Sequence, residues 1–455
     1  MNQLIAKRLQ LFQARLRAQD HVLQAQLNTP SAAASRQPWL QRAARLFTGL
    51  YICQTLLAAA PAIGQIVATP GSGVGQKPLV DAAANGVPIV HIAPPSAGGV
   101  SRNQYDQFNV PTNGLILNNS NANVQTQLGG WISGNLQLGR TPARIIVNEV
   151  TGTNASQLRG TIEVAGQRAD IVIANPNGIM CNGCGFLNTN GRATLVTGHT
   201  QYGADGVVSG FNVNSGSLQV GPKGLNAANQ QQLDLIARGL VIEGEVWAQN
   251  LNVLAGANQV LYGTLNAVLQ GTSTGAPPQF AVDIKQLGGM FANQIYMVAT
   301  EKGLGVNSTG RIAALQGNLK LSVDGNITLK DTQATQDVQL QSSGRTELTG
   351  QTLAGQNLLI QAPTALVNRG TAQAAQRLDI NAARIDNSGT LLQLSNADLA
   401  LRATDVVANS GTIQTAGNLR VQASSIIIGN GIACDNIASI ACLMNRISFI
   451  SATSP

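Results

Sequence analysis

Few side chains in this sequence of 455 residues are spaced for chemistry. The three histidines, His21, His91 and His199, stand far apart, and no HxxxH or HExxH pattern joins them. Cys181 and Cys184 form a Cys-x-x-Cys pair, but one such pair without a second does not make a zinc site. We therefore expect neither a metal nor a cofactor.

The five cysteines are too few for a disulfide scaffold in a chain of this length. They fall at Cys53 and in two close pairs, Cys181/Cys184 and Cys434/Cys442. A thioredoxin-like redox role for Cys181 and Cys184 would require a βαβ context, which the surrounding pattern lacks. Two interpretations stay open for this pair: a small local disulfide, or two buried thiols in a turn.

Catalytic carboxylates are the other chemistry to consider. A polysaccharide-degrading enzyme would carry two carboxylates on one face, roughly 5–10 Å apart. The 21 acidic residues are scattered, and Glu243 and Glu245 are the nearest pair at the same-face spacing of a strand. We interpret them as solvated side chains, so catalysis is the less favoured hypothesis.

The elements that position these residues lie between Asn148 and Gly198. Thr161–Ala165 and Ala169–Ala174 are strand patterns rich in β-branched and small apolar residues, and Arg192–Thr197 is another. Asn175-Pro176-Asn177-Gly178 separates them, with the fixed φ of proline and an Asn-Gly pair suited to positive φ. Strands that are this apolar, joined by turns this close together, must stack on one another.

The same stretch resembles the N-terminal secretion domain of two-partner secretion exoproteins. Asn175-Pro176-Asn177-Gly178-Ile179, the Cys181/Cys184 pair and Gly185-Phe186-Leu187-Asn188-Thr189 match that pattern in order, within a likeness that covers roughly residues 90–310. Filamentous haemagglutinins and contact-dependent growth inhibition exoproteins are the most similar groups. The resemblance implies an all-β, right-handed parallel β-helix with an N-terminal cap and small extra-helical hairpins.

Composition and repeats agree with that fold. Only 11% of residues are charged and 4% aromatic, with 49 Gly, which suits a narrow β-solenoid. Asn368-Arg369-Gly370-Thr371, Asn387-Ser388-Gly389-Thr390 and Asn409-Ser410-Gly411-Thr412 recur after 19 and 22 residues. A period near 20 is typical of one β-helix turn, and it predicts about 18 turns in the mature chain.

The basic residues concentrate in residues 1–62. This segment holds seven Lys and Arg against Asp20, so it carries +6 of the +7 net charge and gives no reason to expect nucleic-acid binding. A basic stretch with a helical pattern precedes an apolar run at Leu46–Ala60, and Ala60-Pro61-Ala62 is a small-x-small cleavage site. We predict an extended signal peptide with a helical leader, read by the Sec machinery and cut near Ala62.

We divide the remaining chain into three parts: residues 63–309 as the secretion domain, 310–430 as haemagglutinin-type repeats and 431–455 as an atypical tail. Within the first part we expect Gln279–Ile284 to form an extra-helical hairpin. The tail lacks the repeat pattern, which leaves a truncation and a deliberate C-terminal cap as alternatives.

The resemblance implies recognition and templated folding rather than catalysis. The expected partner is an outer-membrane β-barrel transporter that exports the chain through the periplasm to the surface of a Gram-negative bacterium. Asn175, Pro176, Asn177, Gly178 and Ile179 are then the candidate secretion motif, with a simple turn as the rival interpretation. Two function classes remain: an adhesin-like exoprotein that contacts host or neighbouring-cell receptors, and a contact-dependent growth inhibition exoprotein without its toxin domain.

Overall fold

The computed structural model describes residues 66–73, 75–139, 141–270 and 273–428, together with the backbone of β40 (Ile432–Cys434) and β41 (Ile447–Phe449). The expected signal peptide and its cleavage site at Ala60 and Ala62 lie outside these residues. In the part of the chain that is described, no helix has the length and apolar character needed to span a membrane.

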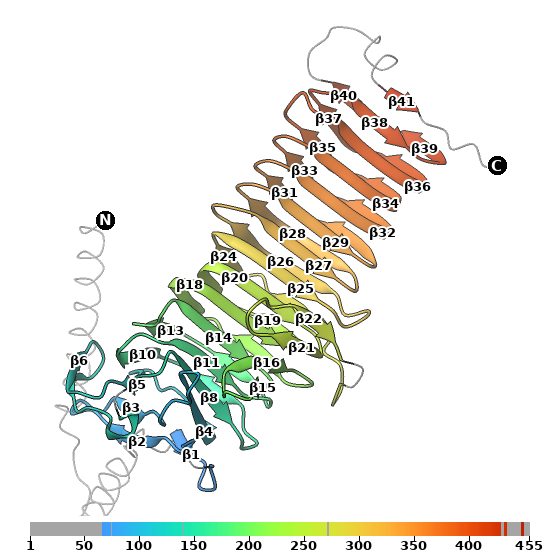
Figure 1. Ribbon diagram of the computed structural model, residues 1–455. Helices are drawn as coiled ribbons and strands as arrows, with labels where there is room; N and C mark the ends of the chain where they lie inside the picture. Colours follow the sequence, from blue (N-terminus) through green and yellow to red (C-terminus); the bar gives the residue numbers. More distant parts are fainter. Residues whose placement is uncertain are drawn as a thin grey trace, which may run out of the picture. The chain divides into compact units, whose positions relative to one another are not determined.

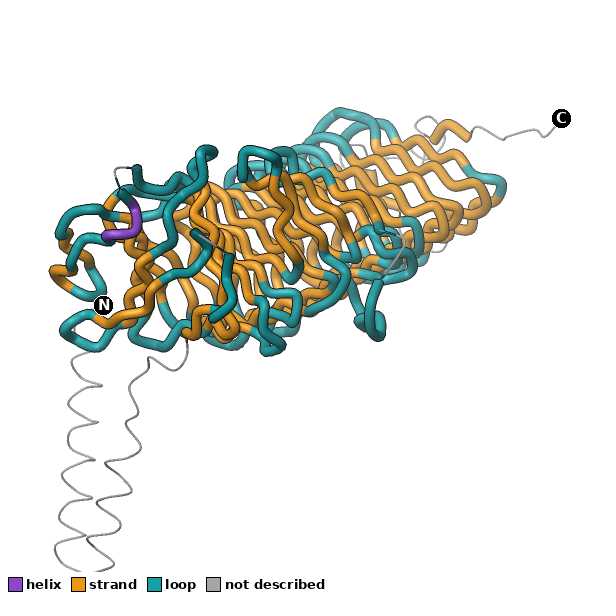
Figure 2. Tube along the Cα trace, turned by 60° about the horizontal axis from the view of Figure 1, so that its bottom comes forward, coloured by secondary structure: helices purple, strands orange, loops and turns teal. Residues whose placement is uncertain are grey.

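A single sheet of 35 strands winds into a parallel β-solenoid of about 13 turns (Figure 1). We call each turn a coil. After the first coil, each coil contributes strands to three faces, and each of these strands pairs in parallel with the neighbouring coils, which gives the long walls of Figure 2. Only β1 and β2, at the N-terminal end of the described sheet, pair antiparallel. Stacking of this kind is what the Asn-x-Gly period predicts.

The first face contains β3 (Pro88–His91), β5 (Leu115–Asn119), β10 (Thr161–Gly166), β13 (Cys184–Leu187), β24 (Gly289–Ala292), β31 (Gln351–Ala354), β33 (Thr371–Ala374), β35 (Thr390–Gln393), β37 (Thr412–Thr415) and β40, with parts of β18 (Leu225–Ala237), β20 (Glu245–Ala255), β26 (Val306–Ala314) and β28 (Ile327–Ala334).

The second face contains β4 (Val100–Phe108), β8 (Ile145–Val150), β11 (Asp170–Ala174), β14 (Arg192–Val196), β25 (Gln294–Ala299), β27 (Leu319–Val323), β29 (Val338–Ser342), β38 (Leu419–Gln422) and β41, with the rest of β18 and β20 and parts of β32 (Leu358–Asn368), β34 (Leu378–Asn387) and β36 (Leu399–Asn409). The third face contains β9 (Ser156–Leu158), β12 (Ile179–Cys181), β17 (Ser217–Val220), β19 (Gly239–Ile242), β23 (Val282–Ile284), β30 (Arg345–Leu348) and β39 (Ser425–Ile428). The remaining parts of β26, β28, β32, β34 and β36 also belong to it.

The prediction of about 18 turns was wrong, because coils in the first half are longer than the repeat period. From Gln333 onward, paired residues on the first face lie 19 to 22 positions apart. Earlier pairs such as Ile116 with Glu163 and Trp247 with Phe291 lie 47 and 44 positions apart. The additional residues of these longer coils belong to segments that leave the solenoid between the paired strands.

Those segments form two antiparallel sheets outside the main stack. β6 (Val124–Thr126) pairs with β7 (Gly130–Ile132) near the 3-10 helix η2 (Leu136–Leu138). β15 (His199–Tyr202), β16 (Val208–Asn212), β21 (Asn258–Leu261) and β22 (Ala267–Leu269) make a four-stranded sheet, which we call the cover sheet.

The prediction of an extra-helical hairpin at Gln279–Ile284 was wrong. Val282–Ile284 is β23, which pairs in parallel with β19 and β26 inside the solenoid. Ala281, Val282 and Ile284 are all buried in the main core, so this short apolar run forms a strand of the solenoid and not a hairpin outside it.

The N-terminal end is closed by antiparallel strands. β1 (Ile66–Ala68) pairs with β4, and β2 (Leu79–Ala82) pairs with β3. Tyr105 and Phe108 anchor this cap from within, fully buried and with ring centroids 4.8 Å apart. An open end would offer unpaired strand edges to other chains, and these antiparallel strands cover it.

The cover sheet packs on the second face. Its Val208, Phe211 and Val260 contact the outward-facing residues Val147, Val172, Val196, Ile236 and Leu254 in a second hydrophobic core. One outward column reads Ala174, Val196, Ile236 and Leu254 under the cover, passes through Val298, and continues as Ser322, Gln341 and Gln361 beyond it. The second face is therefore buried on both sides where the cover sheet lies on it, and the first face is likewise covered at β3, β5 and β10 by a third hydrophobic cluster that includes Val124 and Ile132.

Candidate functional site

The candidate secretion motif is a corner of the solenoid between β11 and β12. The Gly178 N–H donates to the Asn175 carbonyl oxygen at 3.1 Å, and the Asn177 N–H donates to the Asn175 side-chain oxygen at 2.9 Å. Gly178 has a φ of 118°, which a side chain would strain. The sequence Asn-Pro-Asn-Gly thus forms a tight, self-bonded turn.

Asn175 ties this corner to its neighbours. Its side-chain nitrogen donates to Asn154 O at 3.0 Å and to Ser156 Oγ at 2.9 Å, both in the preceding coil. Its backbone N–H donates to Val196 O in the following coil. Because Asn175 is fully buried and bonded on both sides, its contribution is to the stacking of coils.

Asn177 lies on the outside of the same turn. Its side chain is exposed, and its amide nitrogen donates to Gly152 O at 2.7 Å. Pro176 is half-buried beneath the next corner, where Ser215 Oγ donates to its carbonyl oxygen at 3.2 Å. Asn177 is therefore the motif's exposed polar group, and Ile179 enters the core at 2% exposure.

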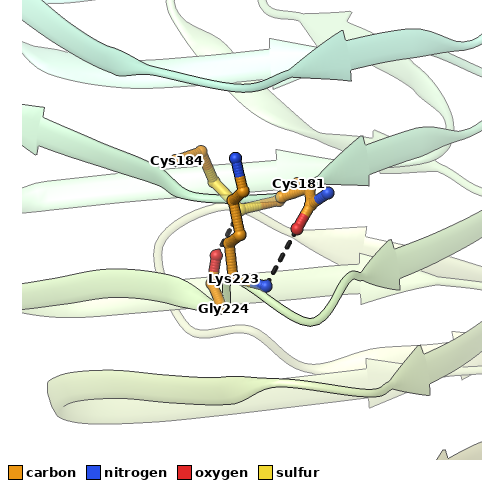
Figure 3. The surroundings of a disulfide bond; sticks show 5 residues. Cys181, Cys184, Lys223 and Gly224 are labelled. Carbon is orange, nitrogen blue, oxygen red and sulfur yellow. Dashed lines mark hydrogen bonds between the residues drawn. A yellow bond between two sulfur atoms is a disulfide. The ribbon is translucent and has the colours of Figure 1, made fainter. Parts of the chain in front are cut away.

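Cys181 and Cys184 close the next corner with a disulfide, their Cα atoms 5.5 Å apart. Both side chains are buried. Figure 3 shows Lys223 and Gly224 of the following coil beside the bond, and the Lys223 N–H donates to Asn182 Oδ1 at 2.9 Å. The Asn182-Gly183 turn is thus fixed from within by the disulfide and from outside by the next corner.

Glu149 joins the first coils to the cover sheet, a role that the sequence did not reveal. Its carboxylate accepts from Arg102 Nε at 2.6 Å and from Tyr202 Oη at 2.7 Å, and Arg102 lies over the Tyr202 ring at 4.7 Å. Burial, then the nearby Glu149 charge, raises the pKa of Tyr202 far above its usual value. The hairpin β15–β16 is thereby held against strands about 50 to 100 residues earlier.

Asp234 forms a second buried network that sequence reasoning missed. Its carboxylate accepts from Arg192 Nε at 2.7 Å, Thr194 Oγ1 at 3.1 Å and Asn252 Nδ2 at 2.8 Å. Arg192 also lies 3.9 Å from the Tyr262 ring centroid. The signal in the sequence was a charge inside the otherwise apolar run Leu233–Ala237.

The remaining chemical candidates are not brought together. His91 Nδ1 lies 3.1 Å from Asn118 Nδ2 at the cap, whereas His199 begins β15 in the cover sheet. Among the described residues, no cluster of three or more His, Cys, Asp or Glu side chains is placed to hold a metal. Glu243 and Glu245 are both exposed, and the Glu245 carboxylate accepts from Trp247 Nε1 at 2.9 Å.

Comparison with known families assigns the first two thirds of the solenoid. Residues 64–329, more than half of the chain, match the family described as the TPS (two-partner secretion) secretion domain. A solved structure titled "filamentous hemagglutinin secretion domain" is 30% identical, superposes with a TM-score of 0.55, and covers 73% of this chain and 98% of its own.

Curated relatives extend the likeness into the repeats. The chain is 48% identical over 260 residues to the tRNA nuclease CdiA-2 of Burkholderia pseudomallei, which covers 57% of this chain and 8% of that protein. It is 39% identical over 391 residues to the 16S rRNA endonuclease CdiA of Enterobacter cloacae, which covers 84% of this chain and 11% of that protein. The chain thus spans about a tenth of the length of these relatives.

Proposed function

The chain belongs to the two-partner secretion exoproteins, and from this premise we propose that its first coils are recognised by an outer-membrane transporter and then template the coils that follow. Exoproteins of this family are secreted or displayed at the cell surface through such a partner. We place the secretion domain at residues 63–309, the repeats at 310–430 and a right-handed winding throughout, as the resemblance implies.

One observation carries the templating proposal: the parallel register passes from the matched segment into the repeats without a break. Ala299 pairs with Val323, Val323 with Ser342, and Leu340 with Ile360. Each new coil buries its apolar side chains against the coil before it and completes that coil's backbone hydrogen bonds. A folded first domain capped at one end supplies the surface on which the next coil can form.

Hydrogen exchange during refolding tests this order. The secreted chain is unfolded in urea, diluted, and pulse-labelled at increasing times. Amides of β8, β11, β14 and β18 are expected to gain protection before those of β32, β34 and β36. Protection that appears first in the repeats, or in both regions at once from separate nuclei, would contradict templating.

Export tests the motif separately. We propose that Asn175 acts through folding and that the exposed Asn177 acts in recognition. Asn177→Ala, expressed with the transporter, is expected to lower export several-fold while the purified chain refolds normally. Asn113→Ala is the control, because Asn113 is also an exposed corner residue whose side-chain nitrogen donates to a backbone carbonyl, that of Gly86, as Asn177 donates to Gly152 O in addition to Asn175 Oδ1. Unchanged export of Asn177→Ala would contradict a role of this side chain in recognition.

Beyond secretion, we propose that this part of the protein acts by binding rather than catalysis. An adhesin-like role at a host or neighbouring-cell surface fits the long exposed faces of the repeats. A contact-dependent growth inhibition exoprotein is the second candidate, favoured by relatives named as CdiA toxins and nucleases. Cell-adhesion and growth-competition assays with the complete gene product distinguish the two.

A further inference from the structure

A notch interrupts the edge where the third face turns into the first. Most corners along this edge are short: two residues separate the strands at Asn182-Gly183 and at Thr309-Gly310. Two corners are longer, with four residues each, at Gly221–Gly224 and Lys285–Gly288. Between them lies the two-residue corner Glu243-Gly244, so the middle coil is recessed between two protruding neighbours.

The notch encloses about 610 Å³, within the size range of small-ligand sites. Glu243 and Glu245 lie on its floor, Pro222 and Lys223 on one wall, and Lys285 and Leu287 on the other. Leu287 is 85% exposed, which is costly for a leucine without a contact. Gly244 keeps the floor low, because a side chain there would begin 2.4 Å from Gly221 O.

An aromatic pair flanks the floor. Trp247 and Phe291 lie on neighbouring first-face strands and stack with centroids 4.5 Å apart and planes 17° from parallel. The indole N–H points to Glu245, and the Phe291 ring lies over Gly289, where a Cβ would be 2.6 Å from its edge. Glu245 and Gly289 are register partners, so both rings lean back along their strands toward the notch.

The charges on the notch nearly cancel. Two glutamates face two lysines, and Lys285 is already paired with Asp283 at 2.5 Å. An ionic ligand would meet as many like charges as opposite ones. A neutral ligand rich in hydroxyl groups would instead find acceptors in the carboxylates, donors in the ammonium groups and apolar contact with Leu287. The two rings lie beside the lining of the notch, where a ligand longer than one sugar would reach them.

From this geometry we propose that the notch between residues 221–224 and 285–288 binds neutral oligosaccharides. Pyranose rings combine hydroxyl groups at the edge with an apolar C–H face, and both kinds of surface meet here. The inference goes beyond secretion and gives the adhesin-like role a specific ligand class and site.

The test uses the secreted full chain against an array of neutral and acidic oligosaccharides, followed by calorimetric titration with the strongest neutral binder. Trp247→Ala and Glu243→Gln are each expected to weaken binding about tenfold or more, equivalent to about 1.4 kcal/mol. Tyr296→Ala is the matched control, since Tyr296 is an outward aromatic of equal exposure, 38% against 37% for Trp247, on the second face.

Each outcome is decisive. Neutral glycan binding that is lost in both notch variants and retained in Tyr296→Ala supports the site. Absence of any neutral binder, binding restricted to sulfated or sialylated glycans, or equal loss in the control variant overturns it. Leu287→Ser, which alters a fully external side chain, repeats the test without risk to the fold. Export of every variant is measured in parallel, so a failure of secretion is recognised independently.

Discussion

The secretion-domain coils and the repeat coils stack in the same way, but different contacts hold them together. Cys181 and Asn368 occupy the same inward column at the same corner, linked through register partners in each intervening coil. At Cys181 a disulfide closes one coil on itself, whereas at Asn368, Asn387 and Asn409 side-chain amides bond from coil to coil at 2.7 and 2.6 Å. At this corner, therefore, the disulfide acts within one coil, whereas the asparagines act between coils.

The second face shows the same contrast. Asp234 and Asp379 stand in one outward column, six coils apart. Asp234 is buried beside the cover sheet, whereas Asp379 pairs with the exposed Arg377 and Arg402. Stability in the first region therefore depends on buried networks, and in the second on the periodic ladder.

The largest expected effect comes from breaking the buried network. Asp234→Ala leaves the Arg192 guanidinium largely buried without its ion pair, and we expect it to cost about 3–5 kcal/mol of unfolding free energy. Asp379→Ala, in the same column but paired with two exposed arginines that water can solvate, is expected to cost about 0–1 kcal/mol. Urea unfolding of the two variants measures the difference, and equal losses would contradict the comparison.

Interrupting the ladder comes next. Asn387→Ala removes the bonds to Asn368 and Asn409 and leaves the buried Asn409 side-chain oxygen without a donor, at a cost of about 1–3 kcal/mol. Hydrogen exchange should increase in β34 and β36 while β11 and β14 stay protected. Ser388→Ala at the same corner, where the side chain is exposed, serves as the control.

Removing the disulfide should matter less. Cys181→Ser/Cys184→Ser opens a very small ring, so the loss should stay below the roughly 3 kcal/mol given by a loop of about 15 residues. A small decrease in melting temperature with export largely intact is the expected result. Lost export together with normal refolding in vitro would mean that the transporter recognises this corner.

The smallest effect concerns pH under the cover sheet. Burial raises the pKa of Tyr262 from 10.0 to about 12, and its hydroxyl has no hydrogen-bond partner. Above pH 10 the folded chain therefore keeps the Tyr262 proton, which the unfolded chain releases. The free energy of unfolding is highest below pH 10 and falls as the pH rises toward 12. Tyr262→Phe should stabilise the protein slightly at pH 8 and reduce the loss measured by thermal melting at pH 11.

The sequence predicts the parts of this protein that repeat or match a motif. The Asn-x-Gly period identified the solenoid, and the Asn175–Gly178 and Cys181–Cys184 corners were correctly located as turns between strands. The cover sheet could not be predicted, because β16 and β21 are joined by pairs such as Phe211 with Val260 that no local pattern specifies. The cover sheet and the β6–β7 hairpin together explain the wrong turn count, since their strands interrupt the period.

A signal for the cover was nevertheless present. Parallel strands buried on both faces are apolar at every position, as in Ile171–Ala174, while one-sided strands alternate, as in Val338–Ser342. The buried charges at Glu149 and Asp234 stayed hidden, because their partners come from other coils and from the cover sheet. Only tertiary packing shows that these polar residues are satisfied.

The parallel register also defines a mechanical response. Backbone hydrogen bonds between coils lie along the solenoid axis, so tension on the last coil peels it away before the next one bears load. A coil of about 20 residues then releases roughly 65–70 Å of extended chain. Peeling would stop at the coils tied together by the cover sheet and by the contact of Tyr202 with Glu149. Under such tension the repeats would extend one coil at a time, and the first coils would stay folded longest.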